Sequence, residues 1–134
     1  AIDFKSELYS LKAIGAGSLD KKEKADFIFV DFWASWCDPC KESFPFYEAK
    51  LKSAKKKILF ISVNLDDKIE KATGFLKEFP QSHPTVWDKE RKFMTLLNFD
   101  AIPYLLILDK DWNQVEAING FNKKTKKKIE KYLE

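Results

Sequence analysis

The chain has 134 residues, 45% of them hydrophobic, which is enough for one packed domain over residues 1–134 and too few for two. Charged residues make up 34% of the chain but leave a net charge of only +3, which argues against a nucleic-acid-binding protein. No apolar run approaches the ~20 residues of a transmembrane helix, so the sequence contains no candidate membrane span.

The first 26 residues have no consistent periodicity, and we treat residues 1–26 as an N-terminal extension. Phe4, Leu8 and Leu11 have helical spacing, whereas the glycines that follow them are typical of a loop. The next segment, residues 27–33, consists almost entirely of β-branched and aromatic side chains. It predicts a strand that is buried on both faces at the centre of a sheet.

A helix and a second strand are predicted after this segment. Apolar side chains recur at helical spacing from Cys40 to Leu51, and residues 58–63 have the composition of another buried strand. A strand, a helix and a strand at this spacing form a βαβ unit. The two strands should therefore be parallel, with a right-handed crossover.

The segment that follows is predicted to hold two helices and a short strand. Asp66 or Asp67 can cap the first helix, which ends at Pro80. Residues 85–87 suit a short edge strand that is reached through a loop. Residues 88–97 then predict a second, short helix.

The C-terminal part is predicted to hold two strands and a helix. Residues 104–108 and 114–118 suit an antiparallel hairpin, and Asn122 can cap a final helix. Lysines are concentrated in that helix and in residues 50–57. The simplest interpretation of both runs is a solvated helix face, and the alternative is contact with an acidic partner or an anionic membrane surface.

The chain's only two cysteines, Cys37 and Cys40, lie in the segment WCDPC, where the first strand gives way to the helix. A thiol at a helix N-terminus faces unpaired backbone N–H groups and the positive end of the helix dipole, which stabilise its thiolate. The second thiol, one turn further on, is close enough to form a disulfide with the first. We therefore expect a dithiol/disulfide exchanger in which an exposed Cys37 sulfur attacks and Cys40 resolves.

A zinc half-site is the structural alternative for two cysteines at this spacing. Zinc needs further ligands, and the chain offers only His83 and no other cysteine, so we expect no metal site. His83 itself lies in a polar loop and is predicted to be a surface residue.

Two acidic residues near the cysteines are candidates for tuning their chemistry. Asp31 is the only acid in an otherwise apolar strand, so its burial should raise its pKa and let it accept and return a proton as Cys40 reacts. The alternative is that Asp31 faces solvent at a strand end. Asp38, between the two thiols, should repel the Cys37 thiolate and so make the pair a better reductant.

The order of the predicted elements, together with several short motifs, resembles the thioredoxin superfamily. The motifs are Val30–Ala34 ahead of the cysteines, Pro45 in the following helix, Ile102–Pro103 before the third core strand and Gly120 after the fourth. The resemblance implies an α/β thioredoxin fold, with a central mixed β-sheet flanked by helices. The segment of residues 68–99 is longer than a plain thioredoxin needs. In this respect the chain resembles the TlpA-like branch, which carries a βα-type insertion before the cis-proline strand.

The resemblance also implies roles for residues around the cysteines. Pro103 would be a cis-proline beside the thiols, the backbone of Ile102 would pair with an extended substrate, and Trp36 and Pro39 would form the rim of the site. Asp31 matches the proton-transfer aspartate of the family. The lysine that often accompanies that aspartate in the neighbouring strand is absent from residues 60–63.

The function implied is thiol:disulfide exchange without a bound organic cofactor, with protein disulfides as substrates and a thiol as electron donor. Reduction is the leading interpretation, a protein-disulfide oxidant or isomerase is the alternative, and a redox-inactive binding module is the alternative of another class. Apocytochrome c is a substrate within the TlpA-like branch, although Ser43 stands where many cytochrome-maturation members have a glutamate. We expect a periplasmic or otherwise exported monomer, anchored to a membrane in its precursor; a cytoplasmic location is the alternative.

Overall fold

The chain is built from short helices and strands that alternate along the sequence. In chain order the elements are α1 (Phe4–Tyr9), β1 (Lys12–Ile14), β2 (Phe27–Trp33), α2 (Asp38–Ser53), β3 (Ile58–Asn64), α3 (Ile69–Glu78), β4 (Thr85–Trp87), α4 (Lys92–Leu97), β5 (Tyr104–Asp109), β6 (Gln114–Asn119) and α5 (Lys123–Leu133). The computed structural model describes residues 1–20 and 23–134. Residues 21–22, part of the predicted extension 1–26, lie outside the described residues.

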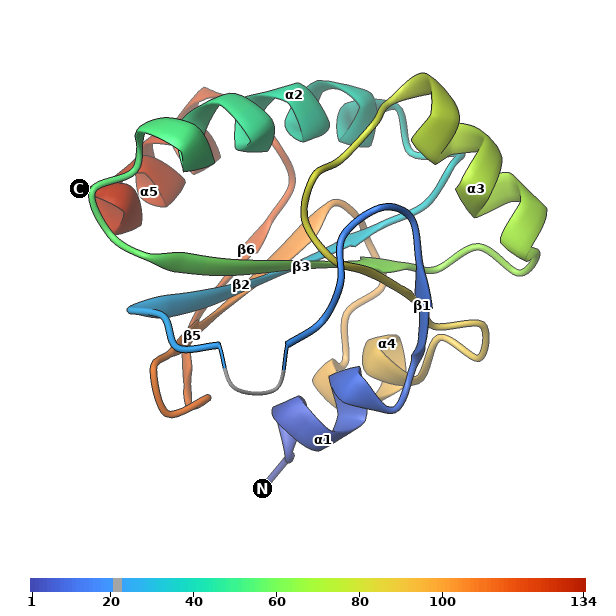
Figure 1. Ribbon diagram of the computed structural model, residues 1–134, viewed down its shortest axis with the longest axis horizontal. Helices are drawn as coiled ribbons and strands as arrows, with labels where there is room; N and C mark the ends of the chain where they lie inside the picture. The colour runs from blue at the N-terminus through green and yellow to red at the C-terminus, as the bar shows by residue number, and fades with distance from the viewer. Residues whose placement is uncertain (21–22) are drawn as a thin grey trace.

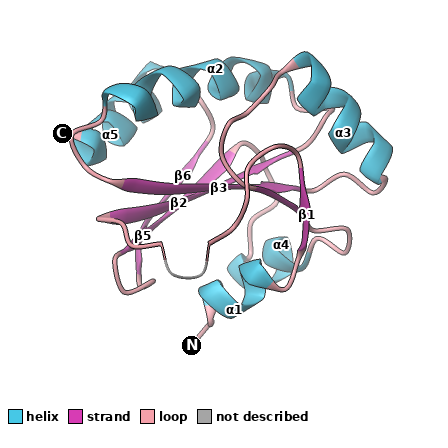
Figure 2. Ribbon diagram, viewed as in Figure 1, coloured by secondary structure: helices cyan, strands magenta, loops and turns pink. Residues whose placement is uncertain are grey.

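Within residues 1–20 and 23–134 the strands form a six-stranded sheet in the order β1-β4-β3-β2-β5-β6. Helices α2, α3 and α5 cover one face of the sheet, and α1 and α4 cover the other (Figure 1). Figure 2 shows the same arrangement by secondary structure. The predicted central mixed sheet flanked by helices is confirmed. None of the helices in the described part of the chain is long and apolar enough to cross a bilayer.

The central strand β2 pairs in parallel with β3 and in antiparallel orientation with β5. The parallel pair is joined by α2, so the predicted βαβ unit is confirmed, as is the antiparallel hairpin of β5 and β6. Alternate residues of β2 face opposite sides of the sheet. Val30 and Phe32 pack in the cluster beneath α1 and α4, whereas Phe29 and Trp33 pack beneath α2 and its neighbours.

The segment after β3 differs from its prediction in three places. Strand β4 is not at the edge, because β1 pairs with it in antiparallel orientation and forms the edge instead. Helix α4 begins at Lys92, because the Asp88 carboxylate accepts hydrogen bonds of 3.0 Å from the backbone N–H groups of Lys92 and Phe93. Neither Asp66 nor Asp67 caps α3, whose N-cap is Lys68.

Candidate active site

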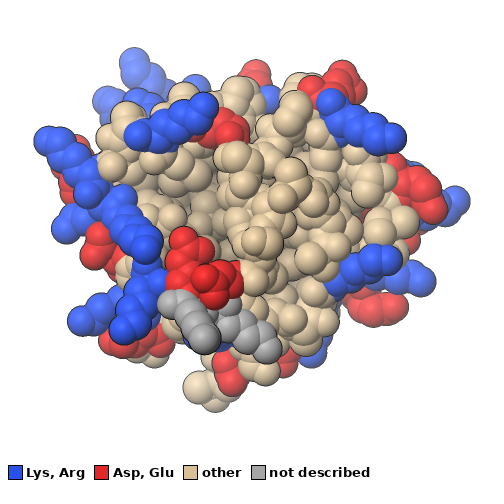
Figure 3. All heavy atoms as spheres, in the orientation of Figure 1, with Lys and Arg blue, Asp and Glu red and all other residues tan. Residues whose placement is uncertain are grey.

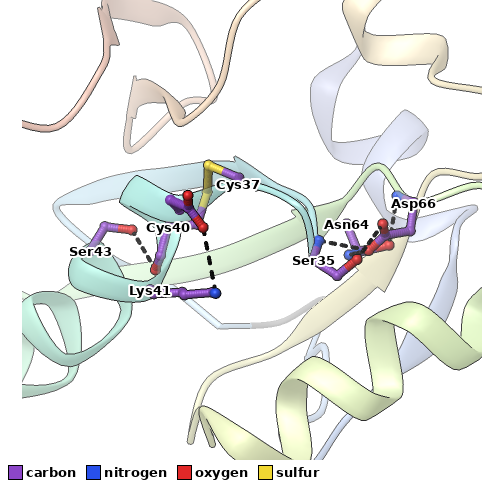
Figure 4. The surroundings of a disulfide bond; sticks show 8 residues. Ser35, Cys37, Cys40, Lys41, Ser43, Asn64 and Asp66 are labelled. Atoms are coloured by element: carbon purple, nitrogen blue, oxygen red, sulfur yellow. Dashed lines mark hydrogen bonds and ion pairs between the residues drawn. A yellow bond between two sulfur atoms is a disulfide. The ribbon is translucent and has the colours of Figure 1, made fainter.

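The two cysteines form a disulfide at the N-terminus of α2, with their Cα atoms 5.4 Å apart (Figure 4). Cys37 is the N-cap of the helix, and its backbone N–H donates to Ala34 O at 3.1 Å. Pro39 follows in the first turn of α2. Proline has no backbone N–H, but in the first turn this group would have no partner within the helix, so its absence does not destabilise the helix. The local sequence therefore favours a helix that starts directly at the first cysteine.

The surroundings of the two sulfur-bearing residues differ. Cys40 is fully buried in a cluster with Trp33 and Phe44, whereas Cys37 keeps 4% of its surface exposed. Trp36, immediately before it, is 61% exposed. Cys37 is therefore buried in this oxidised form, and the expectation of an exposed sulfur is wrong. Cys37 is still less enclosed than Cys40, so a partner reaches it more readily. The roles of attacking and resolving thiol stay predictions.

Ile102 and Pro103 directly precede β5. The peptide bond between them is cis, the isomer that the resemblance implies. Ile102 is half-buried and packs against the cluster that contains both cysteines. It lies before the paired register of β5, which begins at Tyr104. The roles of Trp36, Pro39, Ile102 and Pro103 in substrate binding stay predictions.

Asp31 is 1% exposed, so the alternative in which it faces solvent is wrong. It lies between Phe29 and Trp33 on the face of the sheet that α2 covers. Among the described residues neither of its carboxyl oxygens has a hydrogen-bond partner. Burial raises the pKa of the Asp31 carboxyl well above its ordinary value, which favours the protonated form.

The register of the sheet accounts for the missing partner of Asp31 in residues 1–20 and 23–134. Ser62 of β3 stands opposite it, where a lysine would be needed to form an ion pair. The Ser62 hydroxyl is already engaged, since it accepts a hydrogen bond from Trp33 Nε1 at 3.2 Å and shares one of 2.8 Å with Thr85 Oγ1. Tyr47 of α2 lies near Asp31. The pKa of the Tyr47 hydroxyl is raised well above its ordinary value, mainly by burial and to a smaller extent by the charge of Asp31.

Asp38 and Ser43 lie on opposite sides of α2. The Asp38 side chain is 91% exposed and forms an ion pair of 3.5 Å with Lys41, so water and a neighbouring cation both screen its charge. Ser43 is fully buried, and its hydroxyl donates to the backbone oxygen of Cys40 at 3.2 Å. A glutamate at this position would therefore be buried beneath the second cysteine.

Sequence reasoning missed the role of Asp66, which it interpreted as a helix cap. Asp66 is buried at the end of β3, and its carboxylate accepts hydrogen bonds from Ser35 N at 2.9 Å, Ser35 Oγ at 2.8 Å and Asn64 Nδ2 at 2.8 Å (Figure 4). Ser35 belongs to the loop that leads to Cys37. The predicted order of the strands could have indicated this contact. Ser35 follows β2 and Asp66 follows β3, and polar residues that follow two parallel neighbouring strands meet at the same end of the sheet.

Replacing Asp66 with alanine is expected to lower the free energy of unfolding of the oxidised protein by about 2–4 kcal/mol, because it leaves the buried Asn64 amide and the partly buried Ser35 donors without their acceptor. Urea denaturation measures this change. Asp67→Ala is the matched control, since that side chain is exposed and forms an ion pair of 3.2 Å with Lys71, and it should change the stability little. Equal losses in the two variants would contradict a specific contribution of Asp66.

The prediction of a surface position for His83 is wrong. His83 is buried against the ring of Phe60, with the ring centroids 4.2 Å apart, and its Nδ1 lies 3.2 Å from Glu48 Oε1. Burial lowers the pKa of His83 to about 4, against a smaller opposing effect of Glu48. The imidazole is therefore neutral at pH 7, and it packs in the interior without taking part in the disulfide site.

Comparison with known proteins agrees with this geometry. A profile of the family described as thioredoxin-like matches residues 25–114. A thiol-disulfide oxidoreductase ResA of Bacillus cereus is 30% identical over 115 residues, which cover 85% of this chain and 65% of ResA. The chain thus spans just under two thirds of the length of this relative.

Solved structures are similar over most of the chain. A crystal structure assigned as the thiol:disulfide interchange protein DsbE from Chlorobium tepidum has a TM-score of 0.70 and 28% identity, and covers 85% of this chain and 95% of its own. StoA from Bacillus subtilis has a TM-score of 0.73 and 21% identity, over 92% and 94% of the two chains. At that identity, the similarity to StoA shows the fold alone.

Proposed function

The chain belongs to the thioredoxin-like family, and from this premise we propose that it is a thiol:disulfide oxidoreductase that reduces protein disulfides. The observation that carries the proposal is the disulfide at the start of α2, with the unpartnered Asp31 carboxyl buried on the face of the sheet beneath that helix. The first sulfur borders the exposed Trp36, and the second is enclosed. This arrangement suits one sulfur that meets a partner and one that reacts only with its neighbour.

The proposed reaction begins with the reduced dithiol. The Cys37 thiolate, stabilised by the N-terminal end of α2, attacks one sulfur of a substrate disulfide and displaces the other as a thiolate. Cys40 then loses its proton and attacks Cys37 Sγ, which breaks the mixed disulfide and releases the second substrate thiolate. The substrate gains two electrons and two protons, and the chain returns to the disulfide form seen here.

Asp31 is proposed to move the proton in the second step. Cys40 has to be deprotonated in a fully buried position, where bulk water is excluded. The raised pKa makes the Asp31 carboxylate a stronger base than an ordinary carboxylate, so in its ionised form it is suited to accept that proton and, once protonated, to return it in the opposite direction of reaction. No bound organic cofactor is needed, because both electrons are carried by the two sulfur atoms.

The proposed substrate is an extended segment of a protein that carries a disulfide. Ile102, placed before the paired part of β5, is proposed to bind its backbone, while Pro103, Trp36 and Pro39 form the surrounding rim. A thiol protein is the proposed electron donor. Among such substrates we propose apocytochrome c as one candidate, and we propose that the protein is an exported monomer. The names of the similar proteins support thiol:disulfide exchange in general.

Reduction of insulin disulfides in the presence of a chemical thiol tests the activity, and equilibration with glutathione tests its direction. We expect catalysis above the uncatalysed control and a reduction potential near the thioredoxin range of about −270 mV. A potential near about −120 mV would instead assign an oxidant. A rate equal to the uncatalysed control would assign a redox-inactive binding module.

Replacing Asp38 with histidine is expected to raise the reduction potential by about 15–30 mV, a three- to tenfold change in the equilibrium constant. The exchange removes a carboxylate that repels the Cys37 thiolate, and the exposure of Asp38 keeps the effect small. Glu42→Gln is the matched control, because Glu42 is exposed on α2 but not between the thiols. An unchanged or more negative potential in Asp38→His would rule out a tuning role.

A further inference from the structure

Charge is unevenly distributed along this chain. Residues 50–57 and 123–134 together contain eleven lysines and two glutamates, a net charge of +9. All other residues together contain 13 basic and 19 acidic side chains, a net charge of −6. The modest overall charge of +3 therefore conceals a strongly basic part and an acidic remainder.

The two basic segments form one surface, which we call the basic end. The backbone N–H of Lys55 donates to Leu133 O at 2.8 Å, and Lys50 Nζ lies 2.8 Å from Glu130 Oε2. Lys126 Nζ lies 4.9 Å from the centroid of the Phe121 ring. In Figure 3 lysine side chains, with some acidic side chains among them, lie along the left edge of the molecule, next to α5 and the C-terminal end of α2. Glu116 is one acidic neighbour of the basic end, with its Oε2 3.8 Å from Lys128 Nζ.

We propose that the basic end docks on an anionic lipid bilayer. All its cations are lysines, whose compact, hydrated charges suit a diffuse layer of anionic headgroups better than a specific bidentate contact. Protein interfaces typically draw most of their affinity from a few buried anchor side chains near the centre. The large apolar side chains that are exposed in residues 1–20 and 23–134 are Trp36, Leu96 and Val115, and none of them belongs to the basic end. A basic surface that has no exposed large apolar side chain therefore favours an anionic membrane over an acidic protein as its binding partner.

Docking at the basic end fixes the orientation of the active site. Cys37 and the last lysines of α2 lie at opposite ends of a helix of 16 residues, which is about 24 Å long. The disulfide would thus be held away from the bilayer and open to soluble partners.

Co-sedimentation with lipid vesicles tests this proposal. We expect the oxidised protein to bind vesicles of phosphatidylcholine with about 30% phosphatidylglycerol at low salt, and to be released at about 0.5 M NaCl, where charges are screened within a few ångströms. It should not bind vesicles of phosphatidylcholine alone. Binding that survives high salt, or that is equal on both vesicles, would overturn an electrostatic docking surface.

Two variants with the same net charge separate the basic end from overall charge. Both replace four exposed lysines with glutamine. The test variant changes Lys123, Lys124, Lys127 and Lys131; the control variant changes Lys12, Lys68, Lys77 and Lys89. We expect the test variant to lose at least about tenfold in vesicle affinity and the control variant to lose less than about twofold. Equal losses would overturn the proposal, and circular dichroism checks that both variants fold.

Two further measurements address the partner and the orientation. Tighter binding of polyglutamate than of anionic vesicles at the same salt would assign the basic end to an acidic protein and overturn the lipid proposal. The rate at which soluble dithiothreitol reduces the disulfide should be the same with and without anionic vesicles. A rate that falls on vesicle binding would mean that the active site faces the membrane, against the proposed orientation.

Discussion

Replacing Cys37 with serine is expected to abolish disulfide exchange, lowering insulin reduction by more than about 100-fold, to the uncatalysed rate. The reason is chemical: a serine hydroxyl does not attack a disulfide near neutral pH, and Cys40 is fully enclosed by Trp33, Phe44 and their neighbours. The turbidity assay with dithiothreitol measures the loss. The fold should be retained, since the serine replaces a residue at the helix N-cap, where serine is favoured.

Cys40→Ser is the matched variant, because it removes the other sulfur of the same pair. It should still attack substrates through Cys37 but fail to resolve the mixed disulfide, which therefore accumulates. Non-reducing electrophoresis followed by mass spectrometry detects the trapped partner and identifies the substrate. If Cys37→Ser trapped partners and Cys40→Ser did not, the two roles would be reversed.

The centre of the fold was predictable because its signals are local and strong. Residues 27–33 are apolar on both faces, which only a central strand between two helical layers can bury, and the cysteines mark the start of the next helix. Asp31 was found for the same reason, as the one acid in that strand. The parallel pairing followed from the length of the crossover.

The edges of the fold depend on contacts that are distant in sequence. Strand β1 has three residues, of which only Ile14 is buried, so its conformation comes from pairing with β4 and not from its own composition. His83 is buried because Phe60 and Glu48, which are distant from it in the sequence, lie against its side chain. Asp66 looked like a cap because it precedes a helix, yet the carboxylate turns back to the loop after β2. None of these partners is close enough along the chain for a local pattern to reveal it.

Replacing Asp31 with asparagine is expected to stabilise the folded protein increasingly as the pH rises. The folded-state pKa of Asp31 is raised above the ordinary value of 3.8, so between these two pKa values the unfolded chain is ionised while the folded chain keeps its proton. In that range the parent loses up to about 1.4 kcal/mol of unfolding free energy per pH unit, and the variant does not. Below the unfolded pKa the carboxyl is protonated in both states, so the difference in stability between the two proteins should become independent of pH. Urea denaturation at several pH values measures this, with Asp111→Asn, at an exposed turn, as the control.

The same substitution is expected to lower turnover by about tenfold to a hundredfold near pH 7, although the variant is the more stable protein. An amide cannot take the proton that Cys40 must lose, so the inflection that Asp31 contributes to the pH–rate profile should disappear. If Asp31 had only a structural role, the more stable variant would be at least as active as the parent. Profiles of the parent and Asp31→Asn that coincide across the pH range would show that the proton leaves Cys40 by another path. Profiles that differ only in height, with the inflection retained, would assign that inflection to the Cys37 thiol instead.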